Sequence, residues 1–422
     1  MGRLIFHVDV NSAFLSWEAA RRVARGEADL RQIPSAIGGD AHRGVVVAKS
    51  IPAKALGVRT GESVASALRK CPGLLVVPPD FALYARNSRA FMDICRRHAP
   101  VVEKFSIDEC FLDMSGMERL CPDPLALAAR IKDEIRDELG FTVNVGVAPN
   151  KLLAKMASDF EKPDRVHALF PEELAEKLWP LPVGALYSVG NATARRLTAA
   201  GIRNIGDLAR SDPARIGELV GKKFGRQICR FANGIDDSPV LAEPDQLKGY
   251  SNSTTLERDI SSAEEAHRIL LALADSCASR MRADGARARC VGVTMRDAAF
   301  RDRSHQRKLA QPTDVTDEIY ALCRQLFDAR WDGHSPLRLL GVSLTELSRD
   351  GAEQLSLFPD ARREKNVKLD RTVDDIRRRF GPDTIARGAV LRAGVQVGRK
   401  HRAQAELEAD ASGGRNKAER ET

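Results

Sequence analysis

The chain has 422 residues, too many for one ordinary hydrophobic core, so we expect three or four folded units. Hydrophobic residues make up 43% of the sequence and charged residues 29%, as in folded proteins, while the 5% of aromatic residues argues against a large aromatic binding surface. The 66 lysines and arginines exceed the 58 acidic residues and give a net charge of +8, which favours an anionic partner such as nucleic acid.

Cysteine usage and the lack of long apolar runs indicate the cellular compartment of the protein. The eight cysteines lie among apolar neighbours without a CxxC pair, which is typical of reduced core thiols and indicates neither a zinc site nor disulfides. No apolar run approaches the ~20 residues of a membrane span, and Met1 leads directly into the apolar residues 4–6 without a signal-like segment. We therefore expect a cytoplasmic protein without a membrane partner.

In chain order, the first predicted elements bring acidic residues to strand ends. Residues 4–8 form a short apolar strand that ends at Asp9. Residues 101–112 contain two β-prone runs with the pair Asp108-Glu109 between them, which predicts a hairpin. One acid at a strand end is usually solvated, but three acids on two otherwise apolar strands are costly to bury without a shared cation. The pattern suits phosphoryl transfer assisted by two Mg²⁺ ions.

The next elements define the predicted units. Asp123 as N-cap and Gly140 as stop predict a helix between them, and a strand follows over 141–147. This order predicts an α/β domain with an insertion at about 13–71. The chain then continues with short glycine-punctuated helices from about 180, a linker over 238–248, a unit of strands and two helices to about 347, and a tail of disorder-like composition from 399.

The acidic segments resemble a known family. Residues 7–14, HVDVNSAF, and residues 105–113, FSIDECFLD, are similar to the two catalytic motifs of Y-family DNA polymerases. The resemblance continues through residues 146–159, GVAPNKLLAKMASD, and Lys162-Pro163. It covers roughly residues 1–350 and implies a multidomain α+β, right-hand fold. The implied parts are a palm at 1–12 and 72–172, inserted fingers at 13–71, a helix-hairpin-helix thumb at 173–238, a linker at 239–247, an α+β little finger at 248–349 and a C-terminal tail at 350–422.

The same resemblance implies roles for residues of the first motif and for the acidic pair. Asp9 and Asp108 would bind both Mg²⁺ ions, Glu109 would bind the catalytic one, and the backbone carbonyl of Val10 would complete a site. Phe14 takes the position of a steric gate, with its ring where a ribose 2′-OH would lie. The alternative for Phe14 is an ordinary core phenylalanine.

Three lysines of the third motif lie four and seven residues apart, on one side of a predicted helix or its continuation. Lys162 matches a lysine of the family that contacts the triphosphate, and Lys155 lies in the same motif. Both are predicted to bind the nucleotide. For Lys151 a solvated helix face is the preferred explanation.

The predicted fingers depart from the DNA polymerase IV pattern. Ala48, Ile51 and Lys54 stand where that branch has Thr, Tyr and Arg against the triphosphate, which leaves Lys54 as a nucleotide-binding candidate. Residues 53–58, AKALGV, are more similar to the catalytic subunit of polymerase V. The branch of the family is therefore open between the two.

Two regions are predicted to grip DNA. Residues 188–193 and 201–205 resemble a helix-hairpin-helix, which would offer backbone N–H groups at Val189 and Gly190 to a phosphate; an ordinary packing element is the alternative. The strands of the last unit resemble the little finger and would hold both DNA backbones by counterion release, although a solvated strand face stays open for each arginine. The candidates are Arg287, Arg289, Arg301 and Arg303.

Residues 354–358, Gln354-Leu355-Ser356-Leu357-Phe358, resemble the bacterial sliding-clamp-binding peptide and follow the last folded unit. Apolar anchors in a polar segment are typical of a peptide that enters a partner's pocket, so Gln354, Leu355, Leu357 and Phe358 are the predicted clamp contacts. Beyond them, Leu369, Val373, Ile376 and Phe380 predict a short amphipathic helix, which could dock on the polymerase or on a partner.

The resemblance implies a template-directed DNA polymerase that adds dNTPs to a primer 3′-OH, with low fidelity and past damaged bases. Its partners would be primer–template DNA, dNTP and the sliding clamp, and it would act as a nucleoid-associated monomer. Two alternatives are a catalytically silent clamp-binding adaptor and a cyclase-like enzyme. Retention of Asp9, Asp108 and Glu109 argues against the adaptor, and the DNA-gripping units argue against the cyclase.

Overall fold

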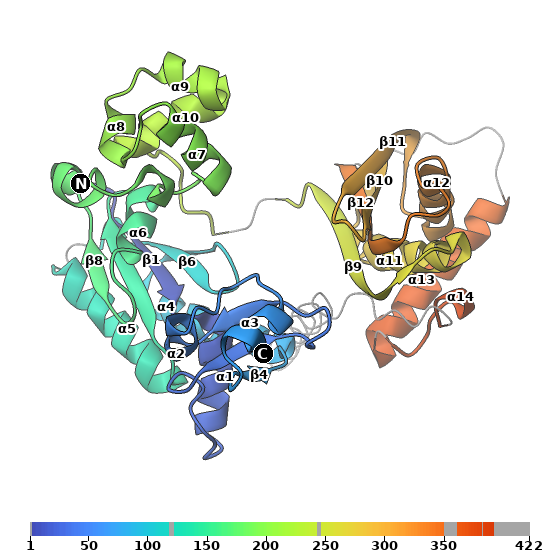
Figure 1. The fold of residues 1–422 in the computed structure, drawn as a ribbon, viewed down its shortest axis with the longest axis horizontal. Helices are drawn as coiled ribbons and strands as arrows, with labels where there is room; N and C mark the ends of the chain where they lie inside the picture. Colours follow the sequence, from blue (N-terminus) through green and yellow to red (C-terminus); the bar gives the residue numbers. More distant parts are fainter. Residues whose placement is uncertain (1, 118–121, 243–245, 350–360, 382, 392–422) are drawn as a thin grey trace, which may run out of the picture. The chain divides into compact units, whose positions relative to one another are not determined.

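The computed structural model describes residues 2–117, 122–242, 246–349, 361–381 and 383–391. The chain divides into two compact units, residues 1–244 and 245–422 (Figure 1). The division lies inside the linker predicted at 239–247. The predicted clamp peptide, residues 354–358, lies outside the described residues.

A five-stranded sheet of order β5-β6-β1-β7-β8 is the centre of the first unit. The predicted strand at Asp9 and the hairpin before and after Asp108 are confirmed, because β1 pairs antiparallel with β6, and β5 with β6. The strands are β1 (Ile5–Val10), β5 (Val101–Lys104), β6 (Glu109–Asp113), β7 (Val143–Ala148) and β8 (Val166–Ala168).

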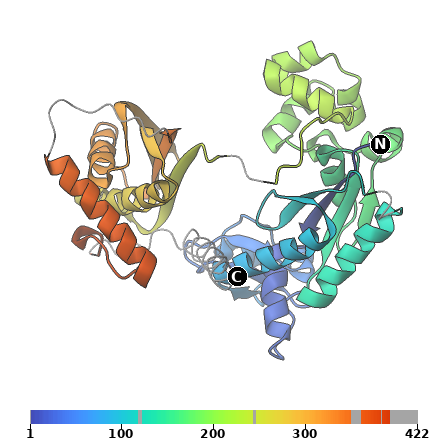
Figure 2. The same ribbon diagram turned by 180° about the vertical axis from the view of Figure 1, so that it is seen from behind.

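Different helices of this unit cover the two faces of the sheet (Figures 1 and 2). Helices α4 (Phe81–His98) and α5 (Pro124–Leu139) pack on the face formed by Phe6, Val8 and Val10. The predicted helix limits are confirmed, since α5 has Asp123 as its N-cap and Gly140 in the left-handed conformation at its end. Because strand side chains alternate, Asp9 points to the opposite face, where α6 (Lys151–Ser158) lies.

Gly146 allows α6 to approach this second face closely. A Cβ atom at this position would lie 1.9 Å from the carbonyl oxygen of Ala154 and 2.6 Å from the backbone nitrogen of Ser158, both in α6. Gly146 pairs with His7 on the neighbouring strand β1. Any side chain at Gly146 would therefore push α6 away from the acidic ends of β1 and β6.

The segment inserted after β1 forms a smaller sheet of order β3-β2-β4. This sheet includes β4, which lies beyond residue 71, where we placed the end of the fingers. Leu15 and Trp17 of α1 pack in the core of the large sheet instead. The domain limits themselves stay a prediction. The elements are α1 (Ala13–Val23), β2 (Ser35–Gly38), β3 (Val46–Lys49), α2 (Ile51–Ala55), α3 (Val64–Lys70) and β4 (Leu75–Val77).

Short helices complete the first unit, as the glycine-punctuated sequence predicts. Their buried residues form one cluster with those of α6, so this helical part packs on the same side of the sheet as α6. After three short turns, η1 (Pro171–Glu173), η2 (Leu174–Leu178) and η3 (Val183–Ala185), come α7 (Asn191–Ala199), α8 (Ile205–Ala209), α9 (Pro213–Val220) and α10 (Lys222–Ala232).

The second unit has a four-stranded antiparallel sheet of order β11-β10-β12-β9 with α11 and α12 packed on one face. Its apolar side chains gather on that face, while the other face carries small polar residues such as Ser251, Ser343 and Thr294. The elements are β9 (Gly249–Ile260), α11 (Ala263–Ala283), β10 (Arg287–Asp297), β11 (Asp302–Thr313), α12 (Thr316–Asp328), β12 (Leu337–Ser348), α13 (Ala361–Phe380) and α14 (Gly388–Leu391).

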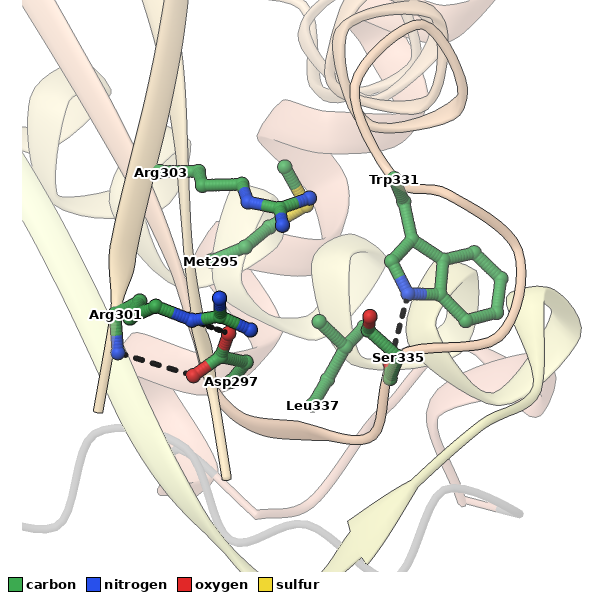
Figure 3. A pocket seen from close by; sticks show the side chains of 7 residues that line it. All are labelled: Met295, Asp297, Arg301, Arg303, Trp331, Ser335 and Leu337. Atoms are coloured by element: carbon green, nitrogen blue, oxygen red, sulfur yellow. Dashed lines mark hydrogen bonds and ion pairs between the residues drawn. The ribbon is translucent and has the colours of Figure 1, made fainter. Parts of the chain in front are cut away.

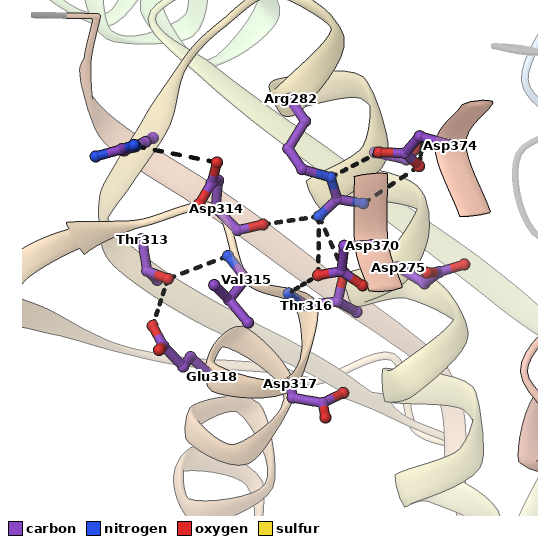
Figure 4. A network of polar contacts seen from close by, with 12 residues as sticks. Asp275, Arg282, Thr313, Asp314, Val315, Thr316, Asp317, Glu318, Asp370 and Asp374 are labelled. Atoms are coloured by element: carbon purple, nitrogen blue, oxygen red, sulfur yellow. Dashed lines mark hydrogen bonds and ion pairs between the residues drawn. The ribbon is translucent and has the colours of Figure 1, made fainter. Parts of the chain in front are cut away.

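Helix α13 docks on the second unit through charged side chains (Figure 4). Asp370 accepts hydrogen bonds from the Thr316 backbone nitrogen at 2.8 Å and from Arg387 at 2.6 Å, and lies 3.4 Å from Arg282. Asp370 thereby caps the N-terminus of α12, which has no side-chain cap of its own. Docking on the chain itself is confirmed.

The predicted helix is confirmed as α13, and charged side chains supply its ion-pair contacts with the second unit. Leu369 and Phe380 are 48% and 70% exposed. Arg282 pairs with Asp374 at 2.7 Å, and Arg377 pairs with Asp275 at 2.8 Å. Ion pairs of this kind leave no apolar period in the sequence, so the spacing of the apolar residues did not indicate these contacts. Across the described parts of the chain, no helix has both the length and the apolar character needed to cross a membrane.

We predict that Asp370→Ala destabilises the docking of α13 by about 3–5 kcal/mol, the cost of breaking a buried ion pair. Arg282 would keep fewer partners in a site where it is only 8% exposed, and the Thr316 N–H would lose its acceptor. Hydrogen exchange of α12 and α13 in the full chain measures this opening. Asp375→Ala is the control, because Asp375 pairs with Arg378 at the exposed surface of the same helix. Equal loss in both variants would contradict the prediction.

Candidate active site

The acidic residues converge at one end of β1 and β6. Asp9 lies directly opposite Glu109 in the antiparallel register, and the backbone nitrogen of Val10 donates a hydrogen bond to the Asp108 carbonyl at 3.0 Å. Asp108 precedes β6 in the turn, where the Ser106 hydroxyl donates to its carboxylate at 2.6 Å. The two strands therefore hold all three predicted acids at neighbouring backbone positions.

Two of the predicted nucleotide-binding lysines contact these acids. Lys155, on α6, donates to Glu109 at 2.9 Å, and Lys162, after α6, pairs with Asp9. Lys162 also lies 2.8 Å from Asp159. The structure thus brings Lys155 and Lys162 to the carboxylates themselves, and each lysine neutralises one acid.

The electrostatics of the three acids reflect this crowding. Burial raises the pKa of Asp9 to about 7, with Glu109 and Asp108 adding to the rise and Lys162 opposing it. Burial also raises the pKa of Glu109, but His7 and Lys155 outweigh it and lower the value to about 2. Asp9 is therefore the carboxylate whose charge is least stabilised by its surroundings, and an additional cation beside it would be favourable.

The chemistry of this donor set fits a divalent cation, since carboxylate oxygens are hard ligands and Asp9 is buried beside other acids. In the described residues no three carboxylate, imidazole or thiolate groups lie close enough together to hold an ion. Lys155 and Lys162 already pair with the carboxylates of Glu109 and Asp9. Binding of an ion by Asp9, Asp108 and Glu109 would require these lysines to move.

An amide network that the sequence did not reveal positions Lys162. The Asn144 side chain, fully buried on β7, donates to the carbonyls of Ser158 at 3.0 Å and Glu161 at 2.6 Å. Asn11 donates to the Asn144 oxygen at 3.1 Å and accepts from the Asp164 backbone nitrogen at 3.0 Å. These bonds attach the segment that carries Lys162 to β1 and β7. Polar residues inside apolar strands were the feature of the sequence that could have indicated this network.

His7 is the second residue that sequence reasoning missed. It is fully buried beside Glu109, with Nδ1 2.8 Å from the Ser158 hydroxyl and Nε2 3.7 Å from the Glu109 carboxylate. Burial lowers the pKa of His7 to about 4. The imidazole is therefore neutral near pH 7 and packs at 4.7 Å against Phe111.

Phe14 is half-buried at the start of α1. Its ring stacks on Tyr84 at 4.6 Å and 14°, and lies 5.9 Å from Trp17. The ring is therefore partly exposed, and its stacking on Tyr84 helps to hold its orientation. The steric-gate role stays a prediction.

In the fingers, Lys54 lies exposed on the short helix α2. Burial and the nearby charge of Lys54 lower the pKa of Lys49, at the end of β3, so the two cations lie near each other. Ile51 is 65% exposed and Ala48 is buried. Lys49 is a cation that the family pattern did not single out, and the predicted role of Lys54 is untested.

The solvated helix face preferred for Lys151 is wrong. Its side chain is 13% exposed and pairs with Glu103 at 2.7 Å. The ammonium also lies 4.8 Å from the centre of the Phe111 ring. Glu103 lies on β5, which is distant in sequence, so the pair could not be read from helical spacing.

The predicted hairpin of the thumb places Gly190 as the N-cap of α7, with no side chain to cap the first N–H groups. Val189 is buried, and Ser188 has a φ of 74°, a conformation that glycine adopts more easily. The backbone near Gly190 has open space around it. The DNA contact of Val189 and Gly190 stays a prediction.

The four candidate arginines of the second unit do not share one surface. Arg303 pairs in register with Met295, a core residue, so it lies on the helix-covered face, and Figure 3 shows its guanidinium beside Met295. Arg301 pairs with Asp297 at 2.8 Å in the same pocket. Arg287 and Arg289 flank the core residue Ala288 and therefore point to the opposite, open face.

Three family profiles match the chain. The impB/mucB/samB family matches residues 8–159, and the impB/mucB/samB family C-terminal domain matches residues 247–357. The thumb domain of DNA polymerase-iota matches residues 184–236. The first match contains all three acids and Lys155, and it ends three residues before Lys162.

Curated relatives cover nearly the whole chain. DNA polymerase IV of Clostridium acetobutylicum is 42% identical over 93% of this chain and 99% of its own length. DNA polymerase IV of Acetivibrio thermocellus is 36% identical over 93% and 98%, and DNA polymerase IV 1 of Bacillus subtilis is 35% identical over 92% and 94%. The similarity of the fingers to polymerase V is not tested by these relatives.

Solved structures share the fold. A Y-family DNA polymerase chimera of Dbh and Dpo4 covers 81% of this chain with a TM-score of 0.71 at 24% identity, and 98% of the chimera is covered. DinB from Sulfolobus solfataricus has a TM-score of 0.54 at 23% identity over the same shares. The predicted right-hand α+β fold is therefore confirmed. Taken with the full-length relatives, these likenesses show that the chain belongs to the Y-family of DNA polymerases.

Proposed function

We propose that the chain adds dNTPs to a primer 3′-OH by two-metal phosphoryl transfer at Asp9, Asp108 and Glu109. As a Y-family member the chain is a DNA-directed DNA polymerase of translesion synthesis, and such polymerases need divalent metal ions. The single observation that carries the assignment of the site is that Asp9 and Glu109 lie opposite each other on β1 and β6, each paired with a lysine, with Asp108 next to Glu109. No observation favours the silent adaptor.

Asp9 and Asp108 are proposed to hold both Mg²⁺ ions, and Glu109 and the Val10 carbonyl to complete the two sites. When bound, the ions neutralise charge on the attacking and leaving oxygens. The protein's contribution is to fix the acids: the β1–β6 register sets Asp9 against Glu109, and Ser106 orients Asp108.

Lys155 and Lys162 are proposed to exchange their carboxylate partners for phosphate oxygens of the incoming nucleotide. Both ammonium groups already lie beside the proposed metal-binding carboxylates, which supports this role. Burial lowers the pKa of Lys162, but Asp9 and Asp159 outweigh it and raise the value, so the ammonium stays charged. Lys54 offers a further point charge from the fingers, and Phe14 is proposed to exclude the 2′-OH.

DNA is proposed to bind at the α7 N-terminus and along the open face of the second unit. The uncapped N–H groups after Gly190 suit a phosphate contact without sequence readout, and Arg287 and Arg289 point to the open face. Arg301 and Arg303 lie at the helix-covered face. DNA bound on the open face would therefore have to extend around the edge of the sheet to reach them. Action as a nucleoid-associated monomer is part of the same proposal.

A sliding clamp is the proposed partner of residues 354–358, which lie between β12 and α13 in the sequence. The contacts are Gln354, Leu355, Leu357 and Phe358. A tether of this kind acts by raising the effective concentration of the polymerase at a primer end.

We predict that Asp108→Ala abolishes nucleotide addition while primer–template affinity stays within about twofold, because the basic DNA contacts are untouched. Single-turnover primer extension and a binding titration on the same preparation measure the two effects. Asp113→Ala, at the other end of β6, is the control. Appreciable extension by Asp108→Ala would exclude this residue from the metal site.

We expect Phe14→Ala to incorporate ribonucleotides much more readily, since a methyl side chain leaves room for the 2′-OH. The ratio of kcat/KM for dNTP and rNTP on one template is the measurement. Phe81→Ala is a matched control that removes another ring of the same aromatic group. Wild-type discrimination in Phe14→Ala would place the gate elsewhere.

Asn144→Ala is predicted to raise the KM for dNTP more than it lowers kcat. The variant frees the segment that carries Lys162, so the charge-assisted contact of Lys162, worth about 1.5–3 kcal/mol, is partly lost. Steady-state kinetics of Asn144→Ala, Lys162→Ala and the double variant test the link. Fully additive losses would show that Asn144 does not act through Lys162.

Replacing Leu357 and Phe358 with Ala should leave distributive synthesis unchanged and abolish stimulation by the clamp. Clamp affinity in a titration, and extension with and without loaded clamp, are the readouts. The unchanged polymerase activity serves as the internal control for folding. Clamp affinity equal to that of the wild type would show that the contact lies outside this peptide.

A further inference from the structure

Helix α13 presents its paired charges to the second unit. Asp370 and Asp374 contact Arg282 (Figure 4). Arg377 contacts Asp275, and Arg363 contacts Glu318. The partners belong to α11, α12 and the turn before α12. The docked side of the helix is therefore close to electrical neutrality, and its position is fixed by several independent ion pairs.

The outward side of α13 carries unpaired cations. Lys365, Lys368, Arg371 and Arg379 are exposed. At ~100° per residue Lys365, Lys368 and Arg379 fall on the side opposite to Asp370 and Asp374, and Arg371 lies at the border of that side. Within the part of the chain that the structure describes, none of the four has a carboxylate partner. The same side carries the acids Glu364 and Asp375, of which Asp375 pairs with Arg378. An excess of positive charge faces solvent.

This surface is separate from the open face of the sheet. The layer of α11 and α12 lies between the sheet and α13, because α13 makes its contacts with residues of those helices and of the turn before α12. Arg287 and Arg289 point away from that layer. Nucleic acid on the open sheet face would therefore leave the outward side of α13 free for a second contact.

We propose that the outward face of α13, formed by Lys365, Lys368, Arg371 and Arg379, binds the phosphate backbone of duplex DNA without reading its sequence. The inference rests on the proposed function in one respect, namely that the chain works on DNA. From Lys365 to Arg371 the helix rises ~9 Å, the axial length of about three phosphates of one strand. The ion pairs hold the helix that carries these cations in place. Little backbone conformational entropy is therefore lost when the helix binds DNA.

Duplex binding as a function of salt tests this contact. The full-length double variant Lys365→Gln/Lys368→Gln is compared with the wild type on a blunt duplex and on a primer–template. Each lost phosphate contact lowers the slope of log K against log salt by ~0.9, so we expect a slope smaller by about 1.8. Arg324→Gln/Arg330→Gln, which removes the same charge from the exposed side of α12 and from the turn after it, is the matched control and should keep the wild-type slope.

The outcomes separate this inference from the proposed function. Equal slopes for the α13 variant and the wild type, or equal losses for the α13 variant and the control, would overturn the inference while duplex binding itself remains. Failure of the wild type to bind either DNA would instead contradict the proposed function. At saturating primer–template the α13 variant should keep wild-type single-nucleotide extension, because the substituted lysines are not among the acids and lysines of the candidate active site.

Discussion

Close packing of α6 against β7 determines where the charged groups of the candidate active site lie. Gly146 permits this approach, and α6 then brings Lys155 to Glu109 and Ser158 to His7. The β1–β6 register supplies the acids from the other side. Buried carboxylates beside one another are unfavourable without cations, and lysines fill that role in the structure. The metal ions that the family uses would take over the same electrostatic task, which connects the packing of the palm to its chemistry.

Strand alternation and neighbouring acids made the core of the site predictable from the sequence. The apolar run ending at Asp9, the hairpin around Asp108 and the capped helix after Asp123 all depend on local patterns, and the structure confirms them. The chain also matched family motifs that give the same acids. Local patterns of this kind can be predicted because each depends on a few neighbouring residues of the sequence.

Other features could not be predicted because they depend on contacts between distant segments. The pair of Lys151 and Glu103 joins α6 to β5, and Asn144 holds a loop that follows it by many residues. For α13, apolar spacing predicted the helix, but its docking depends on Asp370 and its partners elsewhere in the second unit. The two faces of the second sheet were also unpredictable from composition alone, since a register shift near Arg289 decides which arginines point outward.

The central claim is that Asp9, Asp108 and Glu109 together hold two divalent ions. Counting Mn²⁺ ions by electron paramagnetic resonance in a complex with dideoxy-terminated primer–template and dNTP tests it most directly. The account predicts two bound ions in the wild type and one in Glu109→Gln, which retains the ligands shared by both sites. Equal occupancy in the wild type and the variant would contradict the account.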